Sequence, residues 1–266
     1  MTALAVSLRD SGVVAWRNLI NIKRNPDWLL SGTVQPIMFV LLFAYVFGGS
    51  LGGAEYREFL IPGIFVQTVA FNSAFTVIGL ANDLQKGIVD RFRSLPMSRV
   101  AVLLGRTSSD LAVSVLTVVI MSLCGLVVGW RIRGSLVDAL LAYFVLLLFS
   151  FAMSWVGAFI GLVARSVEVA QSAGLLWMFP LTFISSAFVR SESMPGPLRA
   201  FAEWNPITVV SDSLRELFGN PLRVGGPLPD SWPAQHATLY AIGSSLVIIA
   251  VFIPLAVARY RRVASR

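Results

Sequence analysis

Cysteine and histidine are almost missing from this sequence of 266 residues, which contains one of each, Cys124 and His236. A single cysteine can form neither a disulfide framework nor a cysteine-based metal site within one chain. A single histidine likewise excludes catalytic pairs of histidines. Charged residues make up only 13% of the chain, whereas a typical soluble domain has about 25%. Hydrophobic residues make up 56% and the mean hydropathy is +0.76, so composition alone indicates an integral membrane protein.

The sequence also lacks the loop with which many ATPases bind phosphate. That loop needs glycines that bring backbone N–H groups to the phosphates, followed by a lysine that reaches them. The only two lysines, Lys23 and Lys86, are not preceded by such glycines. We therefore expect no enzyme activity, no cofactor and no metal in this chain. The net charge of +7 is attributed to membrane orientation rather than to nucleic-acid binding.

Six charge-free runs dominate the sequence, and each is long enough to cross a membrane. A helix of about 20 residues spans a hydrocarbon core roughly 30 Å thick. Every Asp, Glu, Lys and Arg lies outside these runs. The sequence therefore predicts an all-α integral membrane domain over residues 29–258 with six transmembrane helices. The runs are 29–48, 59–82, 111–130 (its helix beginning near Val100, hence 100–130), 139–164, 169–189 and 237–258.

The distribution of basic residues predicts which side of the membrane each loop faces. The N-terminus, the 83–110 loop, the 165–168 turn and the C-terminal tail together hold 14 Lys and Arg against six Asp and Glu. The opposite side holds seven against eight. Because Lys and Arg accumulate in cytoplasmic loops, both termini and the 83–110 loop are predicted to be cytoplasmic. Residues 259–266 form a basic tail on that side.

Residues 1–28 are predicted to form a cytoplasmic helix that lies on the membrane surface instead of crossing it. Trp16 and Ile20 belong to an apolar helical face, and Arg17 and Arg24 belong to an adjoining polar face. An amphipathic helix with basic residues on its polar side is typical of the membrane interface.

A polar stretch between the second and third runs, residues 83–99, cannot lie in hydrocarbon and needs a structure of its own. Gly87 and Pro96 bracket eight residues, about two helical turns, in which Ile88 and Phe92 share one face. The stretch predicts a short amphipathic helix along the membrane surface with its charged side exposed. Two interpretations remain open here, a solvated loop whose charges set topology and a docking element for a soluble partner.

Two residues of opposite charge, Arg106 and Asp110, precede the third run. Arg106 and Asp110 are four residues apart near the cytoplasmic end of the third helix, so they are expected to pair there.

The long outer segment, residues 190–236, contains two short amphipathic stretches that are too charged and too short to cross the membrane. They are separated at Asn205-Pro206, and Asp212 and Arg215 share a polar face of the second stretch. We predict two outer re-entrant helices that dip into the interface. A plain extracellular loop is the alternative.

Substrate recognition is weakly marked in this sequence. A path lined mostly by Phe, Leu, Val and Ala suits an amphipathic or lipid-like substrate, and it equally suits a closed helix interface. Polar residues within membrane helices commonly form interhelical hydrogen bonds, which is the alternative role for those that could line a path. These residues are Gln35, Gln67, Asn72, Gln171, Thr182 and Ser185.

Two segments resemble permease subunits in the type-2 exporter class of ATP-binding-cassette transporters, and the resemblance covers essentially the whole chain. The run from Gly87 to Ser94 is especially similar to the daunorubicin/doxorubicin-resistance permease branch. The family's coupling segment has an acidic residue, a glycine, Leu or Phe before arginine, then proline and Ser-Arg, present here as Asp83, Gly87, Phe92-Arg93, Pro96 and Ser98-Arg99. The family's loop before the last helix is matched by Pro195, Asn205-Pro206, Thr208 and Arg215.

The resemblance implies a mechanism and a set of partners. Two permease subunits, identical or different, would pair around a central path in membrane lipid, and each would dock on a cytoplasmic P-loop ATPase that binds ATP and Mg. ATP binding would move the 83–99 helix and the N-terminal helix, and the outer helices would form part of the exit. The expected coupling residues are Asp83, Gly87, Asp90, Arg91, Phe92, Arg93, Pro96, Arg17 and Arg24. Of these, Asp90, Arg91, Arg93 and Pro96 are expected to face the ATPase, with Phe92 facing the membrane.

The leading hypothesis is therefore the permease subunit of an ATP-driven exporter in a bacterial cell membrane. Its substrate would be hydrophobic or amphipathic, such as a drug, an antibiotic or a lipid-like molecule. One alternative is a membrane scaffold or assembly protein that transports nothing. The other is an ion-coupled carrier, which the absence of ionisable groups within the six runs disfavours.

Overall fold

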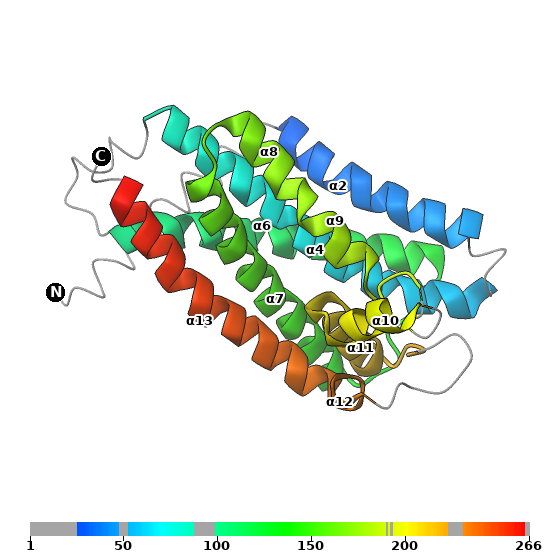
Figure 1. The fold of residues 1–266 in the computed structure, drawn as a ribbon. Coiled ribbons are helices and arrows are strands. Elements are labelled where there is room, and N and C mark those ends of the chain that lie inside the picture. Colours follow the sequence, from blue (N-terminus) through cyan, green and yellow to red (C-terminus); the bar gives the residue numbers. More distant parts are fainter. Residues whose placement is uncertain are drawn as a thin grey trace.

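The regular structure of the chain is helical throughout the part that the computed structural model describes, without a strand in that part (Figure 1). Four long helices carry apolar stretches long enough to cross a membrane. The prediction of an all-α membrane fold is therefore confirmed. The long helices are α4 (Gly53–Gln85), α6 (Arg99–Val128), α7 (Leu136–Val163) and α13 (Ala237–Val263). The residues described are 26–47, 53–87, 99–189, 191, 194–222 and 231–263.

The first predicted span is shorter than these four helices. Helix α2 (Pro26–Leu41) continues into one π-helical stretch, η1 (Leu42–Phe47). Within the part of this segment whose side chains the structure describes, the apolar stretch is Val34–Val46.

The fifth predicted span is interrupted. It consists of α8 (Val167–Leu176) and α9 (Met178–Phe183), which meet at Trp177. Pro180 has no N–H to donate to the carbonyl of Leu176, so the hydrogen-bond ladder is broken at this point. Because the fifth segment is interrupted and only part of the first is described with its side chains, the count of six spans stays a prediction.

Helix α4 lies at the centre of the bundle. In its most apolar stretch 72% of the residues are buried, against 17% in α13. Helix α7 packs against α4 on one side and α13 on the other (Figure 1). Gly157 and Gly161 of α7 permit the close approach, because a Cβ atom at Gly157 would lie 2.5 Å from the carbonyl oxygen of Ser73. Small residues at a spacing of four are typical of tightly packed membrane helices.

Local signals in the sequence account for several helix ends. Ser135 caps α7 in a capping box with Asp138, whose backbone N–H donates to the Ser135 hydroxyl at 3.2 Å. Helix α13 runs to Val263, past the predicted end of the span at residue 258. Within this extension, Arg259 Nε donates to the carbonyl of Leu162 at 3.2 Å.

Three short helices gather at one end of the bundle, opposite the end at which α4 stops and α6 starts (Figure 1). The chain breaks between the first two at Asn205, as the sequence predicts. The second of them is largely buried by α4, α7 and α13. The three are α10 (Gly196–Trp204), α11 (Pro206–Phe218) and α12 (Trp232–Gln235).

Candidate functional site: a cavity and two buried ion pairs

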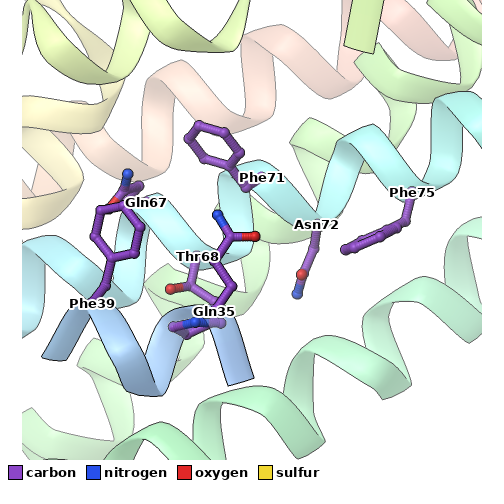
Figure 2. Close-up of a pocket in the computed structure, with 8 residues that line it drawn as sticks. Gln35, Phe39, Gln67, Thr68, Phe71, Asn72 and Phe75 are labelled. Atoms are coloured by element: carbon purple, nitrogen blue, oxygen red, sulfur yellow. The ribbon is translucent and has the colours of Figure 1, made fainter. Parts of the chain in front are cut away.

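A cavity lies between α2 and α4, and three of the six polar residues predicted to line a path meet there (Figure 2). Gln35 comes from α2, and Gln67 and Asn72 come from α4. The cavity is partly open to the surface, and the space in it for water-sized molecules is about 30 Å³, which is room for a few water molecules. All of its lining residues are uncharged: Gln35, Pro36, Phe39, Gln67, Thr68, Phe71, Asn72 and Phe75.

Asn72 supplies the cavity with a hydrogen-bond donor that is not used within the described residues. Its Nδ2 atom is buried and has no partner there. A buried donor without a partner costs about 1–3 kcal/mol, so an acceptor on a bound molecule would relieve this cost. Figure 2 shows Gln35 and Phe39 of α2 on one side of the space and the α4 residues on the other. The lining thus combines apolar rings with a few amides, as is typical of sites for small organic ligands.

The other three predicted path residues do not line this cavity. Gln171 is exposed on α8. Thr182 and Ser185 are buried at the end of α9, where the Ser185 hydroxyl donates to the carbonyl of Thr182. Their roles in substrate binding stay predictions.

Six phenylalanines form a continuous series that leaves the cavity and returns to it. The series includes Phe188, which lies in the segment between α9 and α10. The first and last rings belong to the cavity lining. The spacing is typical of interacting aromatic pairs. Neighbouring ring centroids are 5.0–6.1 Å apart along Phe39, Phe43, Phe188, Phe183, Phe179 and Phe71.

A polar stripe along α11 fastens this helix to residues 181–188. Its members recur every three or four residues, so they share one helical face. Asn205 Nδ2 donates to the carbonyls of Leu181 and Ile184 at 2.6 and 2.7 Å, and its Oδ1 caps α11. Thr208 Oγ1 accepts the backbone N–H of Ser186 at 2.9 Å. The stripe consists of Asn205, Thr208, Asp212 and Arg215, which include two of the three predicted outer residues; the third, Pro206, begins α11.

Arg215 is the last residue of this stripe and makes most of its contacts. Its side chain is fully buried. Its Nη1 atom lies 2.7 Å from Asp212 Oδ1. Its Nε donates to the carbonyl of Phe59 at 2.8 Å, and its guanidinium carbon lies 3.7 Å from the centroid of the Phe59 ring. Its Nη2 donates to the carbonyls of Ser186 and Ala187 at 3.0 and 3.1 Å. One guanidinium therefore ties α11, α4 and the segment after α9 together.

Sequence reasoning missed a second attachment of α11, at its C-terminal end. Trp130 Nε1 donates to Asn220 Oδ1 at 2.7 Å, and Asn220 Nδ2 donates to the carbonyl of Arg131 at 2.9 Å. Gly219 ends the helix with φ of +67°, a left-handed conformation that favours glycine. The Gly-Asn pair after an amphipathic stretch signals the helix end, but no local pattern identifies Trp130 as its partner.

A second ion-pair cluster lies at the opposite end of the bundle. Arg106 Nε lies 3.4 Å from Asp110 Oδ1, which confirms the predicted pairing. Arg106 Nη1 is also 3.8 Å from Asp83 Oδ2. Thr76 donates to Asp110 Oδ2 at 2.8 Å. Asp83, predicted as a coupling residue, is thus held at the junction of α4 and α6.

The predicted coupling segment is described only at its first residues. Gly87 follows α4 with φ of +64°, and its N–H donates to the carbonyl of Leu84 at 3.1 Å. Within the described residues, no group of three or more His, Cys, Asp or Glu could hold a metal ion. The remaining coupling predictions lie outside the described residues: Asp90, Arg91, Phe92, Arg93, Pro96, Arg17 and Arg24.

Comparison with known proteins finds one family and several relatives. Residues 10–218 match the ABC-2 type transporter family. The chain is 32% identical to the daunorubicin resistance ABC transporter permease protein DrrB1 of Streptomyces coeruleorubidus, over 92% of this chain and 84% of that protein. It is 26% identical to the doxorubicin resistance ABC transporter permease protein DrrB of Mycobacterium tuberculosis, over 87% and 84%. It is 24% identical to the putative transport permease ycf38 of Cyanophora paradoxa, over 92% and 85%.

Proposed function

The chain belongs to the ABC-2 type transporter family, and on this premise we propose what it transports, by which route and with which partners. Family membership makes it an integral membrane permease subunit of an ABC exporter, with ATP hydrolysis in a separate subunit. This assignment agrees with the absence of a phosphate-binding loop from the sequence.

The proposed substrate is a hydrophobic or amphipathic molecule such as a drug, an antibiotic or a lipid-like compound. The cavity between α2 and α4 carries this proposal. Its lining has no charged side chain, three phenylalanine rings and an unpaired amide donor at Asn72. Such a lining favours a molecule with a large apolar surface and one or two hydrogen-bond acceptors.

The proposed route leads from the cavity along the phenylalanine series towards α10 and α11. Phe179 and Phe183 are each about half exposed on this route. Phe188 is buried and lies in the segment that Arg215 holds. An aromatic surface of this kind offers apolar contact along its length without one tight binding site. A substrate can therefore move along it instead of remaining bound at one point.

The proposed partners are a cytoplasmic P-loop ATPase, which binds ATP and Mg, and a second permease subunit. The ATPase would dock on residues 83–99 and on the helix predicted within residues 1–28. We place the protein in the bacterial cell membrane with both termini in the cytoplasm, as the excess of basic residues on that side supports.

The two alternatives from the sequence receive no support from the cavity. A scaffold protein needs no buried donor without a partner, such as Asn72 Nδ2, beside a cavity. An ion-coupled carrier needs an ionisable group at its binding site, and no acidic or histidine residue lines this cavity.

The test is transport in inside-out membrane vesicles that contain this chain together with its partner P-loop ATPase, which we expect the neighbouring reading frame to encode. Daunorubicin, which the name of one relative specifies, is a fluorescent probe whose uptake can be followed directly, and a short-chain fluorescent lipid is the second probe. We expect uptake of at least one probe that requires ATP and stops when the phosphate-loop lysine of the ATPase is replaced. Uptake that survives this replacement but stops when the proton gradient is collapsed would overturn the proposal in favour of a carrier.

A further inference from the structure

The charged cluster around Arg106 joins the two helices that enter and leave the coupling segment. Asp83 lies two residues before the end of α4, and Arg106 lies about two turns into α6. Arg106 Nη1 is 3.8 Å from Asp83 Oδ2, and its Nε is 3.4 Å from Asp110 Oδ1. The cluster therefore links the last turn of α4 to the first part of α6.

Arg106 also contacts the turn of α4 that lines the cavity. Its Nη2 donates to the carbonyl of Phe75 at 3.3 Å, and Phe75 is one of the cavity residues. Asn72, with its unpaired amide, lies one turn earlier on the same helix. The guanidinium thus contacts both Asp83, the first residue of the coupling segment, and Phe75, which lines the cavity.

The guanidinium lies directly against the α4 backbone at Gly79. A Cβ atom at this position would overlap the Nη2, Cζ and Nη1 atoms of Arg106. Glycine therefore makes room for the cation at a helix crossing, and no larger residue can replace it without moving Arg106. In this structure the guanidinium therefore lies against the backbone of α4 beside Gly79.

The cluster can hold Arg106 in two arrangements. One carboxylate is on α4, the other is on α6, and the contact with Asp83 at 3.8 Å is an ion pair that is longer than a hydrogen bond. Arg106 Nε has no hydrogen-bond partner among the described residues. The three side chains are only 14–23% exposed, so water screens their charges weakly. A small shift of α4 along α6 would shorten one of these contacts and lengthen the other.

We propose that Arg106 is a positioning residue that transmits movement of the coupling segment to the cavity. Movement of residues 83–99 pulls Asp83 relative to Arg106, and Arg106 passes the displacement to the α4 backbone at Phe75. The two states differ in which carboxylate Arg106 holds more closely, which supplies the differential contact that a two-state change requires. This inference rests on the proposed function, because it needs an ATPase that moves the segment.

The first experiment measures the number of substrate molecules transported per ATP hydrolysed in proteoliposomes that contain the whole complex. Arg106→Gln is expected to lower this ratio at least about fivefold, the low end of the range for allosteric coupling. Assembly with the ATPase and basal ATP hydrolysis remain, since Arg106 lies outside residues 83–99, on which the ATPase would dock. Arg165→Gln is the matched control, because Arg165 is exposed in the turn between α7 and α8 and does not belong to the cluster.

The second experiment separates positioning from charge. Gly79→Ala changes no charge and so leaves the positive-inside signal intact, but it forces the guanidinium away from α4. It is expected to lower the transport ratio as Arg106→Gln does. Gly243→Ala in α13 is the matched control, because a Cβ atom there meets nothing within 4 Å. The double variant Gly79→Ala with Arg106→Ala should lose no more than Arg106→Ala alone, since the overlap is then removed.

The outcomes distinguish this inference from the proposed function. If the unmodified complex shows no ATP-dependent transport, the proposed function itself fails. If the unmodified complex transports and both variants keep its ratio, only the role of Arg106 is overturned. The role is also overturned if the variants lose assembly, hydrolysis and transport together, because that pattern indicates a structural residue. Additive losses in the double variant contradict the shared contact at Gly79 in the same way.

Discussion

At the scale of single residues, the two ion pairs of the outer helices offer a direct comparison. Arg215 and Asp212 are fully and almost fully buried on α11 and lie 2.7 Å apart. Arg199 and Glu203 on α10 are also 2.7 Å apart, but the arginine side chain is 42% exposed. Removing one partner of a buried pair leaves an uncompensated charge, whereas exposed pairs contribute little. The two ion pairs have the same length, but the loss of Arg215 is therefore predicted to cost more folding free energy than the loss of Arg199.

We expect Arg215→Met to destabilise the protein by about 3–5 kcal/mol and Arg199→Met by less than about 1 kcal/mol. The measurement is thermal unfolding of the purified permease in detergent, with the two variants side by side. Replacing Asp212 by Asn in the same chain as Arg215→Met should recover only part of the loss. The carbonyls of Phe59, Ser186 and Ala187 still lack their donor in that double variant. Similar losses for Arg215→Met and Arg199→Met would contradict the conclusion that Arg215 holds α11, α4 and the segment after α9 together.

Asn72 gives a prediction in which stability and function change in opposite directions. Its buried Nδ2 has no partner among the described residues, so Asn72→Leu removes an unsatisfied donor while keeping the number and branching of the side-chain heavy atoms. We expect stability to stay the same or rise by about 1 kcal/mol and ATP-dependent transport to fall. Thermal unfolding and vesicle uptake measure the two effects. Gln171→Leu, at an exposed position outside the cavity, is the control, and unchanged transport in Asn72→Leu would count against the cavity.

At the scale of elements, the junction between α10 and α11 does more than begin a helix. Asn205 caps α11 and also donates to two carbonyls at the end of α9. Asn205→Ala is therefore expected to exceed the cost of an ordinary cap, about 1 kcal/mol, and to loosen both elements. Hydrogen exchange should accelerate in residues 181–188 as well as in the first turn of α11. Ser166→Ala is the comparison, because that cap bonds only its own helix α8 and should change only α8.

Element boundaries could be predicted where the signal is local. The break at Asn205-Pro206 follows from a capping residue before a proline at the first helical position. The interruption at Trp177 was not predicted, although Pro180 is visible in the sequence, because membrane helices often accommodate a proline without breaking. The tertiary partners of individual side chains could not be predicted, for a different reason. Arg215 bonds to Phe59, which is 156 positions away, and no pattern in either segment indicates the contact.

At the scale of the whole molecule, three of the eight residues that line the cavity could be predicted from the sequence. Gln35, Gln67 and Asn72 meet because α2 and α4 pack side by side. Each is a polar residue within an apolar run, and this made it a candidate in the sequence. Gln171 faces outwards, because the orientation of α8 depends on its packing against α4 and on the break that follows it. Such rotations are set by tertiary contacts, so counting polar residues cannot supply them.

The number of membrane crossings can be decided by the direction in which the chain leaves α9. If α8 and α9 together cross the membrane, residue 168 and residue 196 lie on opposite sides, and α13 returns the C-terminus to the cytoplasm. If they do not cross, both positions lie on the same side and α13 carries Arg261 and Arg262 outwards, against the positive-inside rule. The charge distribution therefore favours crossing, even though neither helix is long enough alone.

Cysteine labelling tests this prediction, because Cys124 is the only cysteine to remove. In a Cys124→Ser background, Gly196→Cys introduces an exposed thiol where a Cβ atom meets nothing within 4 Å, and Glu168→Cys introduces one at an exposed position. We expect a membrane-impermeant maleimide to label position 196 in intact cells and position 168 only after permeabilisation. Labelling of both positions only after permeabilisation would contradict six spans. It would also place α10 and α11 on the cytoplasmic face, where they could not form an exit.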